Sequence, residues 1–222
     1  MFAASCSTVC RLDFGFMNDE SFRNLVDSIS ARTATPGGGA VAGINAALGN
    51  ALLLMVIRFS RGKKAGELGE EVLARAEETL EGRMEPIMEL AERDCAAFDS
   101  VARAYGMPKG TPEEKESRGE AIKEGLLGAM VVPEETLAMV RDVLVVAGDI
   151  SSHIGKNIVS DLGAASEVLR ASAETAFLNV RINAAYLQGS DKAEAGMERA
   201  SLIREEVMER HGLIRSAVEE LL

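Results

Sequence analysis

Apolar residues recur at every third or fourth position along most of the chain, and no segment keeps a strict alternation of apolar and polar residues for long. This period is that of an amphipathic α-helix. The pattern predicts helices over residues 19–32, 40–57, 66–105, 111–146, 161–188 and 191–222. A run of four aliphatic residues at 143–146 could form a buried strand, but no partner strand is predicted elsewhere, so it is interpreted as helix. The sequence therefore predicts an all-α fold, a single bundle of five or six long helices.

Glycine, proline and capping residues mark the breaks between these helices. A Thr-Pro-Gly-Gly-Gly segment at 35–39 separates the first two, and a turn at 106–112 separates the two longest. Thr111 is expected to cap the helix that follows, because Glu114 stands at the spacing of a capping box. Ser160 and Asp161 are both residues favoured as N-caps of the next helix. Residues 1–17 are expected to be a flexible leader and 18–222 one helical domain.

The segment from residue 33 to residue 57 carries no charge, and its second part is strongly apolar. Its length is at the lower limit for a helix that spans a membrane. Two asparagines, Asn45 and Asn50, interrupt the apolar run, and no second candidate span follows. The segment is therefore interpreted as a buried central helix of the bundle.

Composition and charge exclude several functions. The net charge is −11, so the surface would repel nucleic acid and anionic lipid, which bind to clustered Lys and Arg. Neither a zinc-binding motif nor a nucleotide-binding motif occurs, and no metal site is predicted. Cys6 and Cys10 lie in the leader, which lacks the features of a signal peptide, and Cys95 lies within a helix. Thiols without a disulfide pattern indicate the cytoplasm.

Carboxylates remain as the natural acid–base groups. Asp94 and Phe98 share a helical face because they are four residues apart, and the surrounding residues are mostly apolar. A carboxylate there would be desolvated and would hold its proton more tightly, as general acid–base catalysis near neutral pH requires. The alternative is a solvated or salt-bridged aspartate. His211 lies on a charged helix and is expected to be solvated, and His153 is interpreted as structural.

Two further groups could bind a ligand. The glycines at 37–39 open a helix, where they would either favour an anion or allow a close crossing with another helix. Asn179 and Asn183 are expected on one helical face, with Arg181 far round the helix. Polar groups in such an apolar segment need partners, either from another helix or from a ligand.

Several motifs, in their order and spacing, resemble one known family. They are Thr35-Pro36-Gly37-Gly38-Gly39, Gly62-Lys63-Lys64, Asp94-x-x-x-Phe98, Tyr105-Gly106-Met107-Pro108 with Thr111-Pro112-Glu113-Glu114-Lys115, Val132-Pro133, Lys156-Asn157, Ser160-Asp161-Leu162-Gly163 and Asn179-Val180-Arg181-Ile182-Asn183. On these residues the chain, from about Asp19 onward, is similar to the cyclodeaminase domain of formiminotransferase-cyclodeaminase and to the methenyltetrahydrofolate cyclohydrolases.

The resemblance implies an all-α homodimer with a folate cleft at the dimer contact, a tetrahydrofolate derivative as substrate and no tightly bound cofactor. It assigns Asp94 as the catalytic acid–base. It implies substrate binding by Pro36, Gly37, Gly38, Gly39, Arg61, Lys63, Lys64, Phe98, Asn157, Asp161, Asn179, Arg181 and Asn183. Three departures from the family pattern affect the ligand contacts: Ala40 replaces a serine, Ile154-Gly155 replaces Gly-Asn, and Ala65 replaces an aromatic residue.

Three functions follow from the resemblance. The first is formimidoyltetrahydrofolate cyclodeaminase, which converts 5-formiminotetrahydrofolate to 5,10-methenyltetrahydrofolate and ammonia. The second is methenyltetrahydrofolate cyclohydrolase, which adds water to the methenyl compound to give 10-formyltetrahydrofolate. The third is a non-catalytic helical binding subunit, which the three departures would favour. Arg61, Lys63 and Lys64 persist in a very acidic chain, and this favours a protein that binds the anionic folate tail.

Overall fold

The computed structural model describes residues 20–62 and 66–222, which form two compact units. The first unit extends to Pro36 and contains one helix, α1 (Glu20–Ser30). The second unit is Gly37–Leu222 and contains every other described helix. The division falls at the Thr-Pro-Gly-Gly-Gly break, whereas the sequence analysis expects one domain from residue 18. The leader at 1–17, like Lys63 and Lys64, lies outside the described residues.

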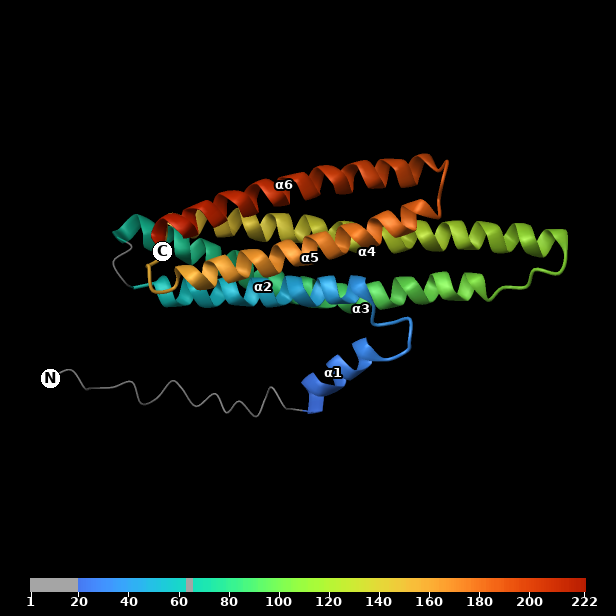
Figure 1. Cartoon of the computed structure of the whole chain (residues 1–222), viewed down its shortest axis with the longest axis horizontal. Helices are drawn as coiled ribbons and strands as arrows, with labels where there is room; N and C mark the ends of the chain where they lie inside the picture. The colour runs from blue at the N-terminus through green and yellow to red at the C-terminus, as the bar shows by residue number, and fades with distance from the viewer. Residues whose placement is uncertain (1–19, 63–65) are drawn as a thin grey trace. The chain divides into compact units, whose positions relative to one another are not determined.

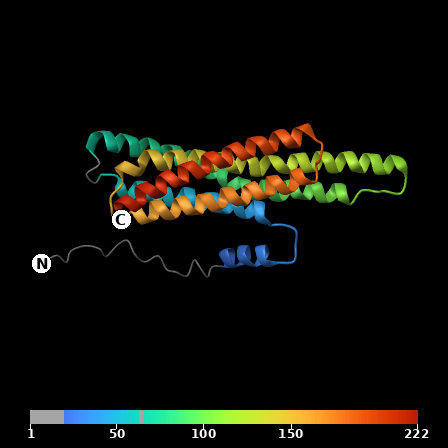
Figure 2. The same cartoon turned by 45° about the horizontal axis from the view of Figure 1, so that its top comes forward.

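The second unit consists of five long α-helices and a short 3₁₀ helix, η2 (Ser151–His153). The α-helices are α2 (Gly38–Ser60), α3 (Gly66–Tyr105), α4 (Pro112–Ile150), α5 (Val159–Ala185) and α6 (Asp191–Leu221). They lie alongside one another, and the far ends of α3 and α4 extend beyond the start of α2 (Figures 1 and 2). The described residues contain no strand, which confirms the all-α prediction and the helical interpretation of residues 143–146.

Helix α2 is the centre of the bundle because one side of it is almost entirely apolar and small. Leu53, Val56 and Ile57 are fully buried, and each such side chain stabilises the fold by about 1.5–3 kcal/mol. By length and composition α2 could also cross a membrane, and 56% of its most apolar window is buried inside the bundle. Its opposite side is different: Leu48 is 58% exposed and Phe59 is 49% exposed. One apolar face of α2 is therefore left uncovered by the other described helices of the second unit.

Most predicted helix boundaries agree with the structure to within a few residues, and the capping box at Thr111 is confirmed. The start of α5 differs. Its N-cap is Ile158, so Ser160 and Asp161 lie within the first turn and do not cap the helix. Ile158 and Val159 are buried, and a turn closed by the Ile158 N–H and the Gly155 carbonyl brings them into the core. Burial of these two side chains therefore decides where the helix begins.

The expectation that His211 is solvated is wrong. His211 is only 8% exposed and lies between α6 and α5. Its Nδ1 is 2.9 Å from the Ser166 hydroxyl oxygen, and its Nε2 is 3.4 Å from a carboxylate oxygen of Glu167. Charged residues surround it on α6, but the ring itself occupies the inner face, which the charge of neighbouring positions does not reveal. Burial lowers the pKa of His211, against the opposing influence of the Glu167 carboxylate.

This buried histidine predicts a loss of stability in acid. Because the pKa of His211 is lower in the folded chain, the unfolded chain takes up a proton first as the pH falls below about 6.5. The free energy of unfolding should therefore fall from about pH 6.5 downward and be unaffected by this group above it. Chemical denaturation of the wild type and of His211→Asn between pH 7.5 and pH 5 measures the difference. Equal pH dependence in the two proteins would contradict the prediction.

Candidate functional site

The N-terminus of α2 offers three backbone N–H groups without helical partners. Gly37 is the N-cap in an extended conformation, and no side chain caps the helix. The first helical bond runs from the Val41 N–H to the Gly37 carbonyl at 3.0 Å. The preceding N–H groups, including that of Ala40, are therefore free to bond to other acceptors. They also lie at the positive end of the helix dipole, so this end attracts an anion.

The carboxylate of Asp94 occupies this position. Asp94 lies on α3 and accepts a hydrogen bond from the Ala40 backbone N–H. Gly39 faces the same carboxylate so closely that a methyl group on it would overlap the carboxylate atoms. One turn later, a Cβ on Gly43 would lie 2.9 Å from the Ala91 backbone nitrogen. Two glycines one turn apart thus let α3 approach α2 and bring Asp94 onto the helix end.

The environment of Asp94 has two opposing influences on its pKa. Asp94 is half-buried, and desolvation, the larger effect, raises the pKa of its carboxyl group. The hydrogen bond from the Ala40 N–H acts in the opposite direction, because it stabilises the anion. The pKa of Asp94 therefore lies above that of an ordinary aspartate, as the sequence analysis expected for a desolvated carboxylate. Ala40 meets the need for a donor here through its backbone, so this contact requires no serine hydroxyl.

Helix α5 lines another side of this helix end with amide groups. A Cβ on Gly38 would lie 3.3 Å from Nδ2 of Asn179, which itself donates to the Thr175 carbonyl at 2.8 Å. The Asn179 Oδ1 accepts no hydrogen bond from the described residues, so it is available to a ligand beside Gly38. Asn183 is already engaged, since its Nδ2 donates to the carbonyls of Ala129 at 3.2 Å and Asn179 at 3.0 Å.

The structure thus gathers one group of the predicted residues at the N-terminal end of α2. This group, termed the Asp94 group, comprises Gly37, Gly38, Gly39, Asp94, Phe98 and Asn179. Phe98 lies one helical turn beyond Asp94 and is 40% exposed. Pro36 immediately precedes Gly37 in the chain and is the last residue of the first unit.

A second group lies at the opposite end of α2, termed the Arg61 group: Arg61, Asn157 and Asp161. The 23 residues of α2 separate its two ends by about 33 Å. Contacts of Gly38 with Asn179 and of Gly49 with Leu169 show that α5 runs antiparallel to α2, so the beginning of α5 lies at the Arg61 end. The guanidinium of Arg61 pairs with Glu70 at 2.8 Å and with Glu77. Within one chain, the two groups cannot contact the same reacting atoms.

Arg181 belongs to neither group. Its side chain is exposed, and its guanidinium carbon lies 5.9 Å from the centre of the Phe177 ring. Asn179 and Asn183 lie on the same face of α5, as the Asn183 contact with the Asn179 carbonyl shows, so the predicted arrangement of the three polar residues is confirmed. The contacts made by the Ala40 N–H and by Thr175 were not predicted from the sequence. A backbone donor is present at almost every position, and a single threonine in a helix has no distinctive sequence pattern.

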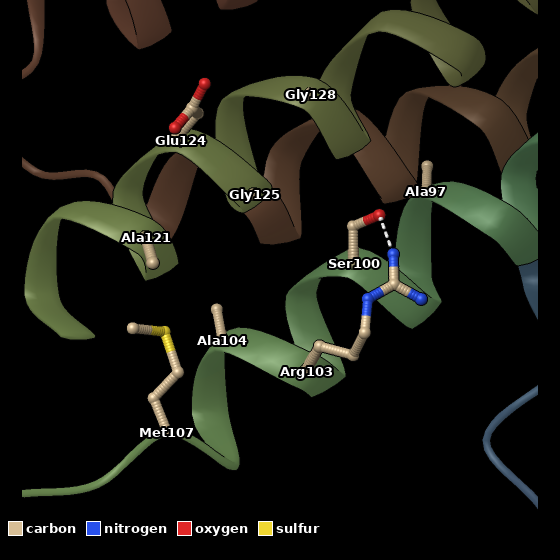
Figure 3. Close-up of a pocket in the computed structure, with 9 residues that line it drawn as sticks. All are labelled: Ala97, Ser100, Arg103, Ala104, Met107, Ala121, Glu124, Gly125 and Gly128. Carbon is tan, nitrogen blue, oxygen red and sulfur yellow. Dashed lines mark hydrogen bonds between the residues drawn. The ribbon is translucent and has the colours of Figure 1, made fainter. Parts of the chain in front are cut away.

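A separate groove of about 500 Å³ lies between the far ends of α3 and α4 (Figure 3). Its walls are mostly alanine and glycine, and its polar residues are Ser100, Arg103 and Glu124. None of the predicted catalytic or substrate-binding residues lines it. Among the described residues, no cluster of three or more His, Cys, Asp and Glu side chains is placed to hold a metal ion.

Comparison with known proteins gives a consistent result. The family model described as formiminotransferase-cyclodeaminase matches residues 21–201. A methenyltetrahydrofolate cyclohydrolase from Methylorubrum extorquens is 33% identical over 199 residues, which are 90% of this chain and 91% of that protein. A formimidoyltransferase-cyclodeaminase from Mus musculus is 29% identical over 90% of this chain, and the match spans only 37% of that longer protein. The crystal structure of a formiminotetrahydrofolate cyclodeaminase from Thermotoga maritima superposes with a TM-score of 0.80 at 25% identity, over 92% of this chain and 98% of that one.

Proposed function

Because this chain belongs to the formiminotransferase-cyclodeaminase family, whose members act on folate one-carbon derivatives, we propose that it is a formimidoyltetrahydrofolate cyclodeaminase with Asp94 as general acid and base. The observation that carries the proposal is the placement of the Asp94 carboxylate. It lies against Gly39 at the N-terminus of α2, accepts the Ala40 N–H and has a raised pKa.

The proposed reaction moves one proton between two nitrogens that flank the same carbon. N10 attacks the carbon of the protonated formimino group of 5-formiminotetrahydrofolate, an amidinium whose nitrogen already carries two hydrogens, and Asp94 takes the N10 proton as the C–N bond forms. The protonated carboxyl then returns the proton to the formimino nitrogen, which leaves as ammonia and gives 5,10-methenyltetrahydrofolate. A raised pKa suits both steps, because the group must hold the proton between them. These transfers require the substrate and one carboxylate, and we propose no resident cofactor.

A second candidate is the cyclohydrolase reaction, because the Methylorubrum relative of that name matches this chain over 91% of its length. There Asp94 would be the general base for water attack on the methenyl carbon, and its negative charge would favour the cationic substrate. The same residue and the same carbon serve both reactions. The cyclodeaminase remains our first proposal, and the two are separated by substrate.

The decisive experiment offers the purified protein each substrate and follows the near-ultraviolet absorbance of 5,10-methenyltetrahydrofolate. Growth of this absorbance from 5-formiminotetrahydrofolate above the uncatalysed rate supports the cyclodeaminase. Faster decay of added 5,10-methenyltetrahydrofolate supports the cyclohydrolase. A folded protein that accelerates neither reaction would contradict both and leave the non-catalytic binding subunit.

We propose the cytoplasm as its compartment, consistent with the free thiol of Cys95.

We also propose a homodimer that uses the uncovered face of α2. Leu48 and Phe59 are exposed there, and Ile44, Leu52 and Met55 are half-buried along the same face. Two copies related by a twofold axis perpendicular to α2 would place their α2 helices antiparallel. The Asp94 group of one copy would then lie beside the Arg61 group of the other. This arrangement gives a reason why the predicted binding residues lie about 33 Å apart in a single chain.

Leu48→Glu tests the dimer. A carboxylate buried without a partner costs several kcal/mol, so the dimer dissociation constant should rise by at least about 100-fold. Light scattering should detect a monomer, and turnover should fall with the dimer fraction. Leu213→Glu is the matched control, since Leu213 is 66% exposed on α6. A Leu48→Glu protein that stays dimeric, or a monomeric one with full turnover, would contradict the proposal.

A further inference from the structure

An exposed aromatic strip continues from Asp94 to the end of α3. Phe98, Ala102 and Tyr105 follow Asp94 by 4, 8 and 11 residues, spacings that place all of them on about the same side of an α-helix. Phe98 is 40% exposed and Tyr105 is 47% exposed. The part of α3 that carries the strip extends beyond the start of α2 (Figure 1). The strip is therefore open to a ligand that reaches Asp94.

A fixed cation stands at the far end of the strip. Arg118, on α4, donates from Nε and Nη2 to the Tyr105 carbonyl at 3.3 and 3.1 Å. Its guanidinium carbon lies 5.6 Å from the centre of the Tyr105 ring. Elsewhere in the described helices, Arg93 and Arg199 pair with glutamates. Arg118 pairs with no carboxylate among the described residues, and its Nη1 has no acceptor there, although the chain carries 35 acidic side chains.

The distance from Asp94 to this cation suits the tail of a folate. The 11 residues from Asp94 to Tyr105 rise by about 16 Å along the helix. A hydrogen bond of about 3 Å at each end leaves about 10 Å. Nine bonds, three of them in the aminobenzoyl ring, join N10 to an α-carboxylate oxygen of the glutamate, and this path spans about 10 Å when it is extended.

We propose that the aromatic strip and Arg118 bind the aminobenzoylglutamate tail of the substrate. The inference rests on the proposed function, since the folate one-carbon unit must lie at Asp94. The benzoyl ring packs on Phe98 and Tyr105, whose side chains are partly exposed, and a glutamate carboxylate accepts a hydrogen bond from the free Nη1 of Arg118. Tyr105 and Arg118 thereby become specificity residues, and the segment that joins α3 to α4 has a role in substrate selection.

Arg118 also has a structural role, because it supplies a cation and two donors at the C-terminal end of α3. The test must separate the two roles. Arg118→Gln keeps an amide donor for the Tyr105 carbonyl but loses the charge, and Arg118→Lys restores a charge. Arg103→Gln is the matched control: Arg103 lies nine residues from Asp94, on the opposite side of α3, and its guanidinium turns back to the Ser100 hydroxyl at 2.8 Å (Figure 3).

The measurement compares the dissociation constants of 5-formyltetrahydrofolate and 5-formyltetrahydropteroate, which lacks the glutamate. The wild type should prefer the glutamylated compound by about tenfold or more, as expected for a charge-assisted pair. Arg118→Gln should reduce this ratio to about one, Arg118→Lys should recover part of it, and Arg103→Gln should retain it. A ratio that Arg118→Gln leaves unchanged would overturn the inference, as would equal binding of the two compounds by the wild type.

Because this readout is binding, it is independent of the reaction. Glutamate-dependent binding lost in Arg118→Gln, in a protein that turns over neither folate substrate, would support the tail site and contradict the proposed catalysis. Turnover in the wild type, together with an unchanged glutamate preference in Arg118→Gln, would support the proposed catalysis and contradict the tail site. If Arg118→Gln does not fold, Arg118→Lys is the test. A fully stable Arg118→Lys protein with a reduced preference for the glutamylated compound supports the tail site. An unchanged preference contradicts it.

Discussion

Replacing Asp94 with Asn is expected to lower turnover of the folate substrate by about 10²–10⁴-fold while the chain stays folded. Asn keeps the size of the side chain and an oxygen that can accept the Ala40 N–H, so the contact at the N-terminus of α2 survives. It cannot take or return a proton. The measurement is kcat/KM for the wild type and Asp94→Asn, with circular dichroism to establish folding. Turnover of the folded variant at the parental rate would exclude Asp94 as the acid–base.

The same substitution should raise stability at neutral pH. The pKa of Asp94 is higher in the folded chain than in the unfolded chain, so the folded chain binds the proton more tightly. The wild type therefore gains stability as the pH falls through the raised pKa, and at neutral pH it carries the cost of a desolvated anion. Asp94→Asn removes that cost. Its stability advantage over the wild type should be greatest near pH 7 and should shrink in acid.

The pH profile of catalysis follows from the same shift. A general base must be ionised, so kcat/KM should fall on the acid side with a midpoint above the pKa of an ordinary aspartate. This profile distinguishes the proposed role from a purely structural one. If Asp94 were only structural, the fall of kcat/KM in acid would be set by other titrating groups and would not depend on the pKa of Asp94. The substrate can also titrate in this pH range. The pH profile of Asp94→Asn, measured in parallel, gives the correction for that effect.

Much of the fold could be predicted because the helical period is local. Helix α3 begins and ends where the pattern places it, and the capping box at Thr111 depends on residues three apart. The catalytic candidate was also accessible, since apolar neighbours on one helix indicate which side of Asp94 faces inward. These inferences need only the spacing of residues within one helix.

What could not be predicted depends on packing between helices. Nothing local in the sequence indicates that His211 bonds to Ser166 on another helix, or that Arg61 pairs with Glu70 and Glu77. The same holds for the separation of the predicted binding residues. Arg61 and Gly39 are only 22 positions apart, but a continuous helix holds them at opposite ends of α2. Residue identity suggested a common site, whereas the length of α2 separates these residues by about 33 Å in one chain. The proposed homodimer would bring them together.

The triple glycine admits two interpretations from the sequence, an anion-binding helix end or a close helix crossing, and the structure unites them. Gly39 permits the crossing that carries an anion, the Asp94 carboxylate, onto the helix end. The requirement is steric and not conformational, because the backbone here is ordinary helix. It follows that a single methyl group at position 39 should displace the Asp94 carboxylate.

Gly39→Ala is therefore expected to cost both activity and stability. The new methyl group would overlap the Asp94 carboxylate, which must turn away and lose the Ala40 N–H. Overpacking of this kind costs about 1–3 kcal/mol. A carboxylate displaced from its position should lose most of its catalytic effect, about 100-fold or more. Denaturant unfolding and kcat/KM are the measurements. The control is Gly128→Ala, since Gly128 lies on α4 with no heavy atom near the added carbon.

A double variant shows whether the overlap is the cause. In an Asp94→Ala background no carboxylate meets the methyl group, so Gly39→Ala should cost no stability there and could add up to about 1 kcal/mol from the higher helix propensity of alanine. The interaction free energy of this cycle should accordingly be at least as large as the whole single-variant loss. Equal destabilisation in both backgrounds would mean that Gly39 is needed for another contact, and that the position of Asp94 does not depend on the absence of a side chain opposite it.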